Sequence, residues 1–137
     1  MKRLPTKEEF EALLKFPYKW DEKRKGQIVT AENGNELFFP AFSCYEDMNV
    51  LNESYNGDYW SATLDDTDFV WYLYLYAEGM SMSLSLFNYN LLIRLVSDEL
   101  CEGFIDMGTG IYWSIENYKE GEKKYFTWNE AMKIPQK

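Results

Sequence analysis

Residues 80–86 alternate strictly between apolar side chains and serine, in the order Met-Ser-Met-Ser-Leu-Ser-Leu. Successive side chains of a strand point to opposite faces of its sheet, so the pattern is typical of a strand with one buried and one solvated face. Further period-2 runs, separated by turn residues, extend from Gly57 to Val96. We therefore expect an antiparallel meander, and this expectation constrains the fold more than any other feature of the chain.

Further strands are expected on both sides of this meander. Asn33-Gly34 lies between two apolar runs, and because this dipeptide tolerates positive φ angles, it predicts a hairpin over Gln27–Pro40. The charged segment Tyr18–Lys25 is expected to be a loop, and Ala41–Asn56, which has no clean period, a long irregular excursion. The remaining predicted strands are Tyr59–Thr63, Asp68–Ala77, Met80–Phe87, Leu91–Val96, Phe104–Met107 and Ile111–Ile115.

Two short segments have the pattern that begins a helix. Thr6 with Glu9, and Thr127 with Glu130, have the spacing of a capping box, in which the threonine and the glutamate each satisfy a free backbone N–H group. Pro17 is expected to end the first helix. The apolar face of that helix consists of Phe10, Leu13 and Leu14. Two helices and about seven strands predict an α+β fold with a mostly antiparallel sheet.

The negative charge of the chain is concentrated in its middle. The net charge is −9, yet between Gly26 and Tyr118 a single basic residue, Arg94, faces fifteen acidic ones. Such a region repels phosphate backbones and anionic lipids, so we expect no direct nucleic-acid binding and no membrane binding. Two interpretations remain open: the charge serves solubility, or it attracts basic partners and imitates nucleic acid. Arg94 itself is expected to form a structural ion pair with a nearby acid.

The residue content argues against an enzyme. The chain has no histidine, which removes the commonest general base, the commonest metal ligand and any Ser-His or Cys-His nucleophile pair. Neither Cys44 nor Cys101 has a basic neighbour in the sequence, and we expect both to be reduced and inert. No phosphate-binding loop or metal motif occurs, so no cofactor is expected. In the absence of a transmembrane run or a secretory signal, we expect a cytoplasmic location.

Four segments occur in the order and at the spacing of a known family. They are residues 3–10 (RLPTKEEF), 33–40 (NGNELFFP), 57–62 (GDYWSA) and 92–96 (LIRLV). They resemble the major-paralogous-domain family of bacterial proteins, which shares a C-type-lectin-like fold with the variable proteins of diversity-generating retroelements. The resemblance implies a C-type-lectin-like α+β fold, with a mostly antiparallel twisted sheet and two helices.

The end of the chain resembles the beginning of that family. Residues 104–108 (FIDMG), 112–114 (YWS), 117–118 (NY) and 125–131 (YFTWNEA) are similar to an opening that normally precedes the segment at residues 3–10. The resemblance therefore implies a circular permutation, or a piece cut out of phase from a tandem array. We expect residues 1–137 to form one C-type-lectin-like domain in which 104–132 occupies the family's N-terminal position. A loop, Ser97–Gly103, would then join the strands Leu91–Val96 and Phe104–Met107 as a hairpin.

Sugar-binding members of the C-type-lectin-like fold hold calcium with an acidic-Pro-Asn loop and a Trp-Asn-Asp strand. The first motif is missing from this chain. Residues 128–130 (Trp-Asn-Glu) resemble the second, but Glu130 is expected to cap a helix. We therefore expect no metal site and no calcium-dependent sugar binding.

The resemblance also indicates where a ligand would bind. In the retroelement proteins, ligand contacts come from exposed positions between the YWSS-like segment and the closing strand. Tyrosine, serine and asparagine dominate those positions in this chain, which is a composition typical of antibody binding sites. The corresponding residues are Asp66, Asp68, Tyr72, Tyr74, Tyr76, Ser81, Ser83, Ser85, Asn88, Tyr89 and Asn90. Trp60 and Trp71 are assigned to the core.

These observations favour a small, non-enzymatic module that recognises a protein partner through an acidic, Tyr/Ser/Asn-rich sheet face. One alternative is a compact, phage-type inhibitor whose acidic surface blocks a nucleic-acid-binding enzyme of a bacterial defence system. A second alternative is a glycan-binding lectin. Salt dependence separates the first two, because binding to a basic groove weakens steeply as salt rises whereas a hydrophobic interface barely responds.

Overall fold

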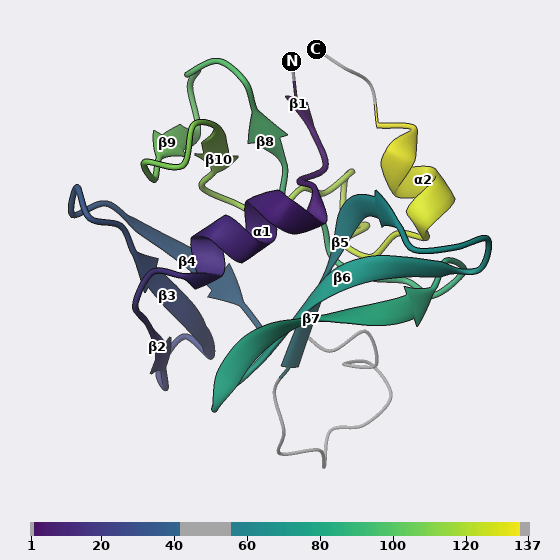
Figure 1. Cartoon of the computed structure of the whole chain (residues 1–137), viewed down its shortest axis with the longest axis horizontal. Helices are drawn as coiled ribbons and strands as arrows, with labels where there is room; N and C mark the ends of the chain where they lie inside the picture. Colours follow the sequence, from purple (N-terminus) through teal and green to yellow (C-terminus); the bar gives the residue numbers. More distant parts are fainter. Residues whose placement is uncertain (1, 42–55, 135–137) are drawn as a thin grey trace.

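The computed structural model describes residues 2–41 and 56–134, so the predicted irregular excursion Ala41–Asn56 lies almost wholly outside the described residues. Within the described part, ten strands and two helices form a mostly antiparallel α+β fold, as predicted. The strands are grouped in three sheets, and Figure 1 shows helix α1 (Lys7–Leu14) lying between them.

One three-stranded sheet precedes the meander. Its order is β2-β3-β4, with β2 Tyr18–Asp21, β3 Gly26–Thr30 and β4 Glu36–Pro40. The hairpin predicted over Gln27–Pro40 is confirmed. The loop predicted over Tyr18–Lys25 is wrong in its first half, because Tyr18–Asp21 pairs with Gly26–Val29. Its charged residues concealed a period-2 pattern, in which Tyr18 and Trp20 alternate with Lys19 and Asp21.

The meander forms the second three-stranded sheet, in the order β5-β6-β7. Its strands are β5 Asn56–Leu64, β6 Phe69–Tyr76 and β7 Gly79–Leu86. The predicted strands Asp68–Ala77 and Met80–Phe87 do pair as a hairpin, with Phe69 opposite Leu86 and Tyr76 opposite Gly79. The turn, expected at Glu78-Gly79, is one residue earlier, at Ala77-Glu78, because Gly79 already belongs to β7.

The third sheet joins the two ends of the chain. Its order is β1-β8-β10-β9, with β1 Lys2–Arg3, β8 Val96–Ser97, β10 Tyr112–Ser114 and β9 Phe104–Asp106. The hairpin predicted between Leu91–Val96 and Phe104–Met107 is therefore wrong, since β10 lies between β8 and β9. After β9 the chain turns, and the short strand β10 pairs with β9 on one side and with β8 on the other. Its pairing with β8 involves only Tyr112 and Trp113.

The predicted strand Leu91–Val96 is also mostly wrong. All seven residues from Leu91 to Ser97 are buried, and only Val96–Ser97 belongs to a strand. The segment runs between the other elements and bonds to several of them: the Leu91 N–H donates to the carbonyl of Phe126, and the Leu92 N–H to that of Asp58. Because these bonds go to several neighbours, the segment does not need one pairing strand along its length to satisfy its backbone.

Both predicted capping boxes are confirmed. In α1 the Thr6 hydroxyl accepts a hydrogen bond from the Glu9 N–H, and the Glu9 carboxylate accepts one from the Thr6 N–H. In α2 (Trp128–Met132), Thr127 and Glu130 repeat the arrangement. Each box satisfies N–H groups that the first turn of a helix leaves without partners.

The core consists of two clusters that lie on opposite faces of β5. Tyr59 belongs to the first, here called the central cluster, and the next residue, Trp60, to the second, the lateral cluster. The central cluster joins α1 to all three sheets through Phe10, Leu13, Val29, Ala31, Leu37, Phe39, Ala41, Tyr59, Leu73, Leu75, Met80, Leu92, Val96, Met107 and Trp113. The lateral cluster contains Leu4, Trp60, Val70, Leu91, Ile93, Leu95, Phe126, Ala131 and Ile134.

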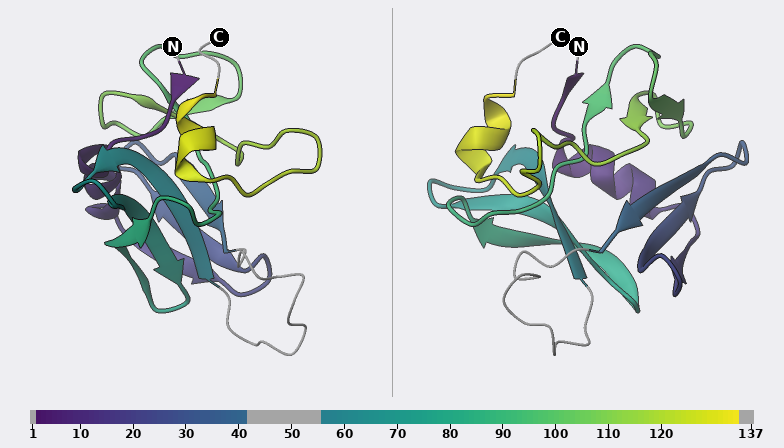
Figure 2. Two further views of the ribbon diagram at one scale, coloured as in Figure 1. Left: turned by 90° about the vertical axis from the view of Figure 1, so that its right-hand side faces the viewer. Right: turned by 180° about the vertical axis from the view of Figure 1, so that it is seen from behind.

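Residues 104–134 contribute to both clusters. Trp113 and Met107 are fully buried in the central one, while Phe126, Ala131 and Ile134 pack in the lateral one. Figure 2 shows α2 beside the strand that opens the described chain, and a cavity lined by both ends lies between them. Within the described residues, no helix has the length and apolar character needed to cross a membrane.

Candidate protein-binding surface

Three of the predicted site residues form a row of tyrosines on one face of β6. Tyr72 lies opposite Ser83 and Tyr74 opposite Ser81, so these side chains share a face of the β6–β7 hairpin. The rings of Tyr74 and Tyr76 are 5.1 Å apart between centroids. Tyr76 and Ser81 are exposed, and the other three are half-buried. The structure thus brings these five predicted residues together.

Ser85 does not belong with them. It is only 9 % exposed, it lies opposite the buried Val70, and its hydroxyl donates to the carbonyl of Leu86. Conversely, Leu84 and Leu86 are 40 % and 37 % exposed. The expectation of one buried apolar face and one solvated serine face therefore fails in the second half of β7. The central cluster covers the apolar face only at the Met80 end, and the lateral cluster covers the opposite face at the Ser85 end.

The apolar side chains left uncovered form a patch that we call the hairpin patch: Phe69, Leu84 and Leu86. Phe69 lies opposite Leu86, and Leu84 lies opposite Trp71 on the same face. Phe69 is 38 % exposed. Trp71, assigned to the core from sequence, is only half-buried, and its ring lies 4.5 Å from the Lys7 ammonium. Sequence reasoning missed the patch because an apolar residue on an alternating strand is expected to be buried.

Acidic and polar residues flank the hairpin patch at one end of the sheet. Asp66 and Asp68 lie in the turn between β5 and β6, and the Asp66 carboxylate accepts hydrogen bonds from the N–H groups of Asp68 and Phe69. The predicted residues Asn88, Tyr89 and Asn90 follow β7 at this same end and are all exposed. The eleven predicted residues are thus divided into the tyrosine row with Ser81 and Ser83, the five residues of this acidic end, and the buried Ser85.

Strand β7 is an edge strand of its sheet. The Met80 N–H points away from β6, because it donates to the Tyr18 hydroxyl at 3.4 Å. Residues of an antiparallel strand bond alternately to its two sides, so the backbone groups of Met82 and Leu84 point to the same outer side. Within the described residues, no backbone hydrogen bond reaches either of them from outside the sheet. No residue from Gly79 to Ile93 is charged.

Asp58 is a half-buried residue beside the tyrosine row. It lies opposite Tyr74, and its Oδ1 atom is buried and has no hydrogen-bond partner among the described residues. Burial raises the pKa of Asp58 to about 6, against a weaker opposing effect of a hydrogen bond from Asn56. Burial, followed by the Asp58 charge, also raises the pKa of Tyr72.

Arg94 does not form the ion pair that was expected, since the salt bridges between described residues do not include it. It is 1 % exposed, and its hydrogen-bond acceptors are the Asn117 amide and the backbone carbonyls of Phe38 and Ser114. Its guanidinium lies 4.5 Å from the Phe39 ring. Burial lowers the pKa of Arg94 to about 10, so the group remains cationic at neutral pH.

The described residues offer no metal site, and the comparisons with known proteins give no relative. Across residues 2–41 and 56–134, no group of three Cys, Asp or Glu side chains is placed to hold a metal ion, and the Glu130 carboxylate accepts the capping hydrogen bond at 2.9 Å. Comparisons of the chain with protein-family models, with curated proteins and with solved structures found no match.

Proposed function

We propose that the chain is a non-enzymatic module that binds a protein partner by accepting an extended segment of that partner on the free edge of β7. The observation that carries the proposal is an edge strand with no charged residue, in which Met82 and Leu84 receive no outer backbone hydrogen bond from the described residues and Leu84 and Leu86 are exposed. Edge strands of soluble proteins are usually protected by lysine, proline or a covering segment. An open edge is the template for strand addition.

The surroundings of the edge define the chemistry of the partner segment. An added strand has two faces, so its side chains would contact Leu84 and Leu86 on one face and Ser81, Ser83 and the tyrosine row on the other. Asp65, Asp66 and Asp68 lie at one end of the hairpin and Glu78 at the other. The occupant that fits is an extended segment with alternating apolar residues and a Lys or Arg at one or both ends.

The net charge of −9 argues for a different protein and against a second copy of this chain as the occupant, because two copies repel each other. This proposal keeps the acidic, Tyr/Ser/Asn-rich hairpin predicted from sequence as the binding element. It moves the centre of the site from the tyrosine face to the neighbouring strand edge.

The scaffold that we propose for this module is C-type-lectin-like and circularly permuted, of bacterial or phage origin. The four-stranded sheet β1-β8-β10-β9 supports this scaffold. Strand β8 begins at the last residue of the segment that is similar to the family's closing strand. It pairs with β1 on one side and, on the other, with β10, a strand of the opening-like tail. This neighbourhood is what a permuted chain requires if its tail replaces the missing opening.

Selection from a random peptide library tests the proposal without knowledge of the natural partner. We expect the enriched peptides to have alternating apolar residues and basic ends, and their binding to slow hydrogen exchange at the Met82 and Leu84 amides. Leu84→Lys and Met82→Pro should each abolish binding, because the first places a charge on the edge and the second removes an outward N–H donor.

Leu100→Lys provides the matched control, since Leu100 is an equally apolar and even more exposed residue outside the hairpin. The proposal is wrong if bound peptides leave exchange at Met82 and Leu84 unchanged, or if the control loses binding as strongly as Leu84→Lys. A dimer that Leu84→Lys dissociates would identify a second copy as the occupant. Binding that responds steeply to salt but survives both edge variants would instead favour the inhibitor that blocks a basic groove.

A further inference from the structure

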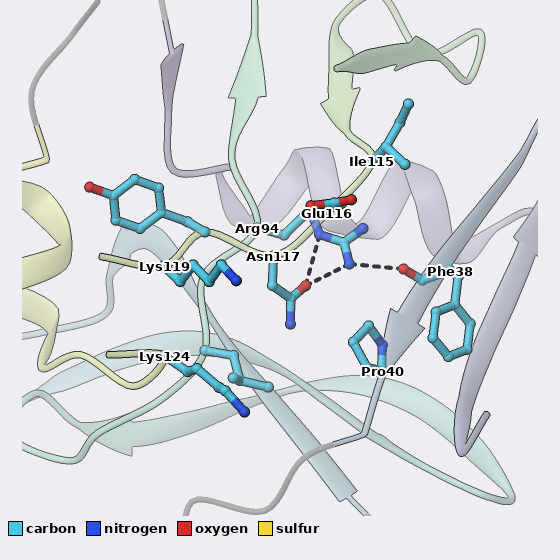
Figure 3. Close-up of a pocket in the computed structure, with 10 residues that line it drawn as sticks. Phe38, Pro40, Arg94, Ile115, Glu116, Asn117, Lys119 and Lys124 are labelled. Carbon is cyan, nitrogen blue, oxygen red and sulfur yellow. Dashed lines mark hydrogen bonds between the residues drawn. The ribbon is translucent and has the colours of Figure 1, made fainter. Parts of the chain in front are cut away.

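A cavity of about 270 Å³ is lined by residues of β4, of the buried segment that begins at Leu91, and of the tail after β10. None of these segments belongs to the proposed partner interface. Its walls combine the apolar side chains of Phe38, Pro40, Leu92 and Ile115 with the cationic or amide side chains of Arg94, Asn117, Lys119 and Lys124. Figure 3 shows Arg94 and Asn117 at the centre of this wall, with Lys119 beside them. Small-molecule sites typically have this composition, in which a few polar groups fix the orientation of an apolar ligand.

Arg94 brings an uncompensated positive charge to this wall. All its acceptors among residues 2–41 and 56–134, namely Asn117 Oδ1 and the carbonyls of Phe38 and Ser114, are neutral. A charge without a counter-charge is costly when it is removed from water, and it is usually found where an anion binds or an acid is paired. Arg94 is also the single basic residue between Gly26 and Tyr118, in a region with fifteen acidic ones, yet no salt bridge between described residues includes it.

The guanidinium also has donor capacity to spare. It has five N–H groups, and four of them donate to described residues. These are the Nε–H, both N–H groups of Nη2, and one N–H of Nη1, whose bond to the Ser114 carbonyl is long at 3.3 Å. One N–H of Nη1 thus has no acceptor within residues 2–41 and 56–134. The Asn117 Nδ2 donates to the Tyr59 hydroxyl at 3.0 Å, which fixes the amide with its oxygen toward Arg94.

The nearest acid does not neutralise the site. Glu116 lines the cavity. Burial lowers the pKa of Arg94, while Tyr59 and then the charge of Glu116 raise it by less than burial lowers it. Glu116 is nevertheless exposed and makes no ion pair with Arg94. Among the described residues that line the cavity, Arg94 and Lys119 bring two positive charges and Glu116 the one carboxylate.

We propose that this cavity binds the carboxylate of a small apolar ligand, with the carboxylate beside Arg94 and Lys119 and the apolar body against Phe38, Pro40 and Ile115. A carboxylate suits the site because a single open guanidinium N–H and nearby ammonium groups supply few donors, whereas a phosphate dianion requires more. The apolar walls favour an organic acid over an inorganic anion. The C-terminal residue of a peptide and a free carboxylic acid share this chemistry.

A titration of ¹⁵N-labelled protein with N-acetylphenylalanine tests the site, with the corresponding amide, N-acetylphenylalaninamide, as the uncharged control. We expect the acid to shift the Arg94 Nε–H resonance and the backbone amides of Asn117 and Lys119, while the amide leaves them in place. 4-Phenylbutyrate, a free acid without a peptide bond, distinguishes the two sources: equal binding indicates a free acid and weaker binding a peptide C-terminus.

Variants at the rim of the cavity avoid the risk that Arg94 substitutions unfold the protein. Lys119→Gln should weaken binding of the acid about two- to fivefold, the range expected for one exposed ion pair. Lys133→Gln, an exposed lysine outside the cavity, should have no effect, and Glu116→Gln should tighten binding by removing the competing carboxylate. Equal shifts with the acid and the amide, equal shifts with inorganic phosphate, or equal losses in the two lysine variants would overturn the proposal.

Discussion

The amide oxygen of Asn117 accepts two hydrogen bonds from Arg94, at 2.9 Å from Nε and 2.5 Å from Nη2. The two residues come from different parts of the chain, Arg94 from the buried segment after the meander and Asn117 from the tail that resembles the family's opening. Their pairing ties the tail to the core at a point where polar groups are buried. An asparagine satisfies the guanidinium without neutralising it, so the pair leaves the charge of Arg94 available to a ligand.

Replacing Asn117 should therefore cost far more than its small side chain suggests. Asn117→Ala removes the acceptor of two Arg94 N–H groups and the donor to Tyr59, leaving buried polar groups without partners. We expect the free energy of unfolding to fall by about 3–5 kcal/mol, the usual cost of breaking a buried charged network. Urea unfolding measures the loss. Asn129→Ala, at an exposed position of α2, is the control and should change stability by less than about 0.5 kcal/mol.

The capping box of α1 should contribute more stability than that of α2. The Glu9 carboxylate also accepts two hydrogen bonds from Arg3, at 2.8 Å each, and is partly buried, whereas Glu130 is exposed. Burial raises the pKa of Glu9, but the bonds from Arg3 and from the Thr6 backbone outweigh it, and the net effect lowers the pKa. We expect Glu9→Ala to cost about 2 kcal/mol and Glu130→Ala about 0.5–1 kcal/mol in urea unfolding.

Because the pKa of Glu9 is lowered in the folded state, its contribution is present above the unfolded-state pKa and is lost as the pH falls through the folded-state value. The difference in stability between the parent protein and Glu9→Ala should therefore shrink on acidification. A difference that stays constant into acid solution would show that Glu9 acts only through packing.

The open edge of β7 should limit the solubility of the free protein. An uncharged edge strand with exposed apolar side chains pairs with other chains, and one lysine on such a strand is a common natural protection. Leu84→Lys should therefore reduce light scattering on prolonged incubation at high concentration. Since Leu84 is already 40 % exposed, we expect the free energy of unfolding to change by less than about 1 kcal/mol.

Leu73→Ala is the control for the edge, because Leu73 lies on the same face of the sheet as Leu84 but is buried in the central cluster. It should destabilise the protein by about 2–5 kcal/mol and increase scattering. If Leu84→Lys scatters as much light as the parent protein, aggregation does not proceed through this edge.

Local patterns predicted the parts of the structure that depend on neighbouring residues. The two capping boxes, the Asn33-Gly34 hairpin and the β6–β7 pairing follow from side chains a few positions apart. The alternation in residues 80–86 also correctly predicted a strand there. The alternation did not predict which face of β7 is covered at each end of the strand. The residues that cover it, in α1 and in the lateral cluster, come from distant segments of the chain.

The candidate sites depend on such long-range contacts. Leu84 is exposed because no described helix or strand covers that end of the sheet, and among the described residues the tail gives Arg94 the amide of Asn117 in place of an acid. Two features of the sequence did point to them: the uncharged run from Gly79 to Ile93, and the isolation of Arg94 among acidic residues. Local spacing in the sequence does not show which residues lie beside the uncharged run or beside Arg94 in the fold.

Asp58 should make the protein less stable at neutral than at mildly acidic pH. Its pKa is raised from 3.8 to about 6 by burial, so between these values the folded state binds more protons than the unfolded state. The contribution of Asp58 is fully favourable below about pH 4 and is lost as the pH rises through about 6, because burial disfavours the charged carboxylate and Oδ1 has no hydrogen-bond partner among the described residues. Asp58→Asn should remove this cost and stabilise the protein at pH 7 by about 2 kcal/mol, with little change near pH 4. Urea unfolding of both proteins across this range measures the difference, with Asp68→Asn as the exposed control; an Asp58→Asn gain that does not grow with pH would contradict the burial of an ionised Asp58.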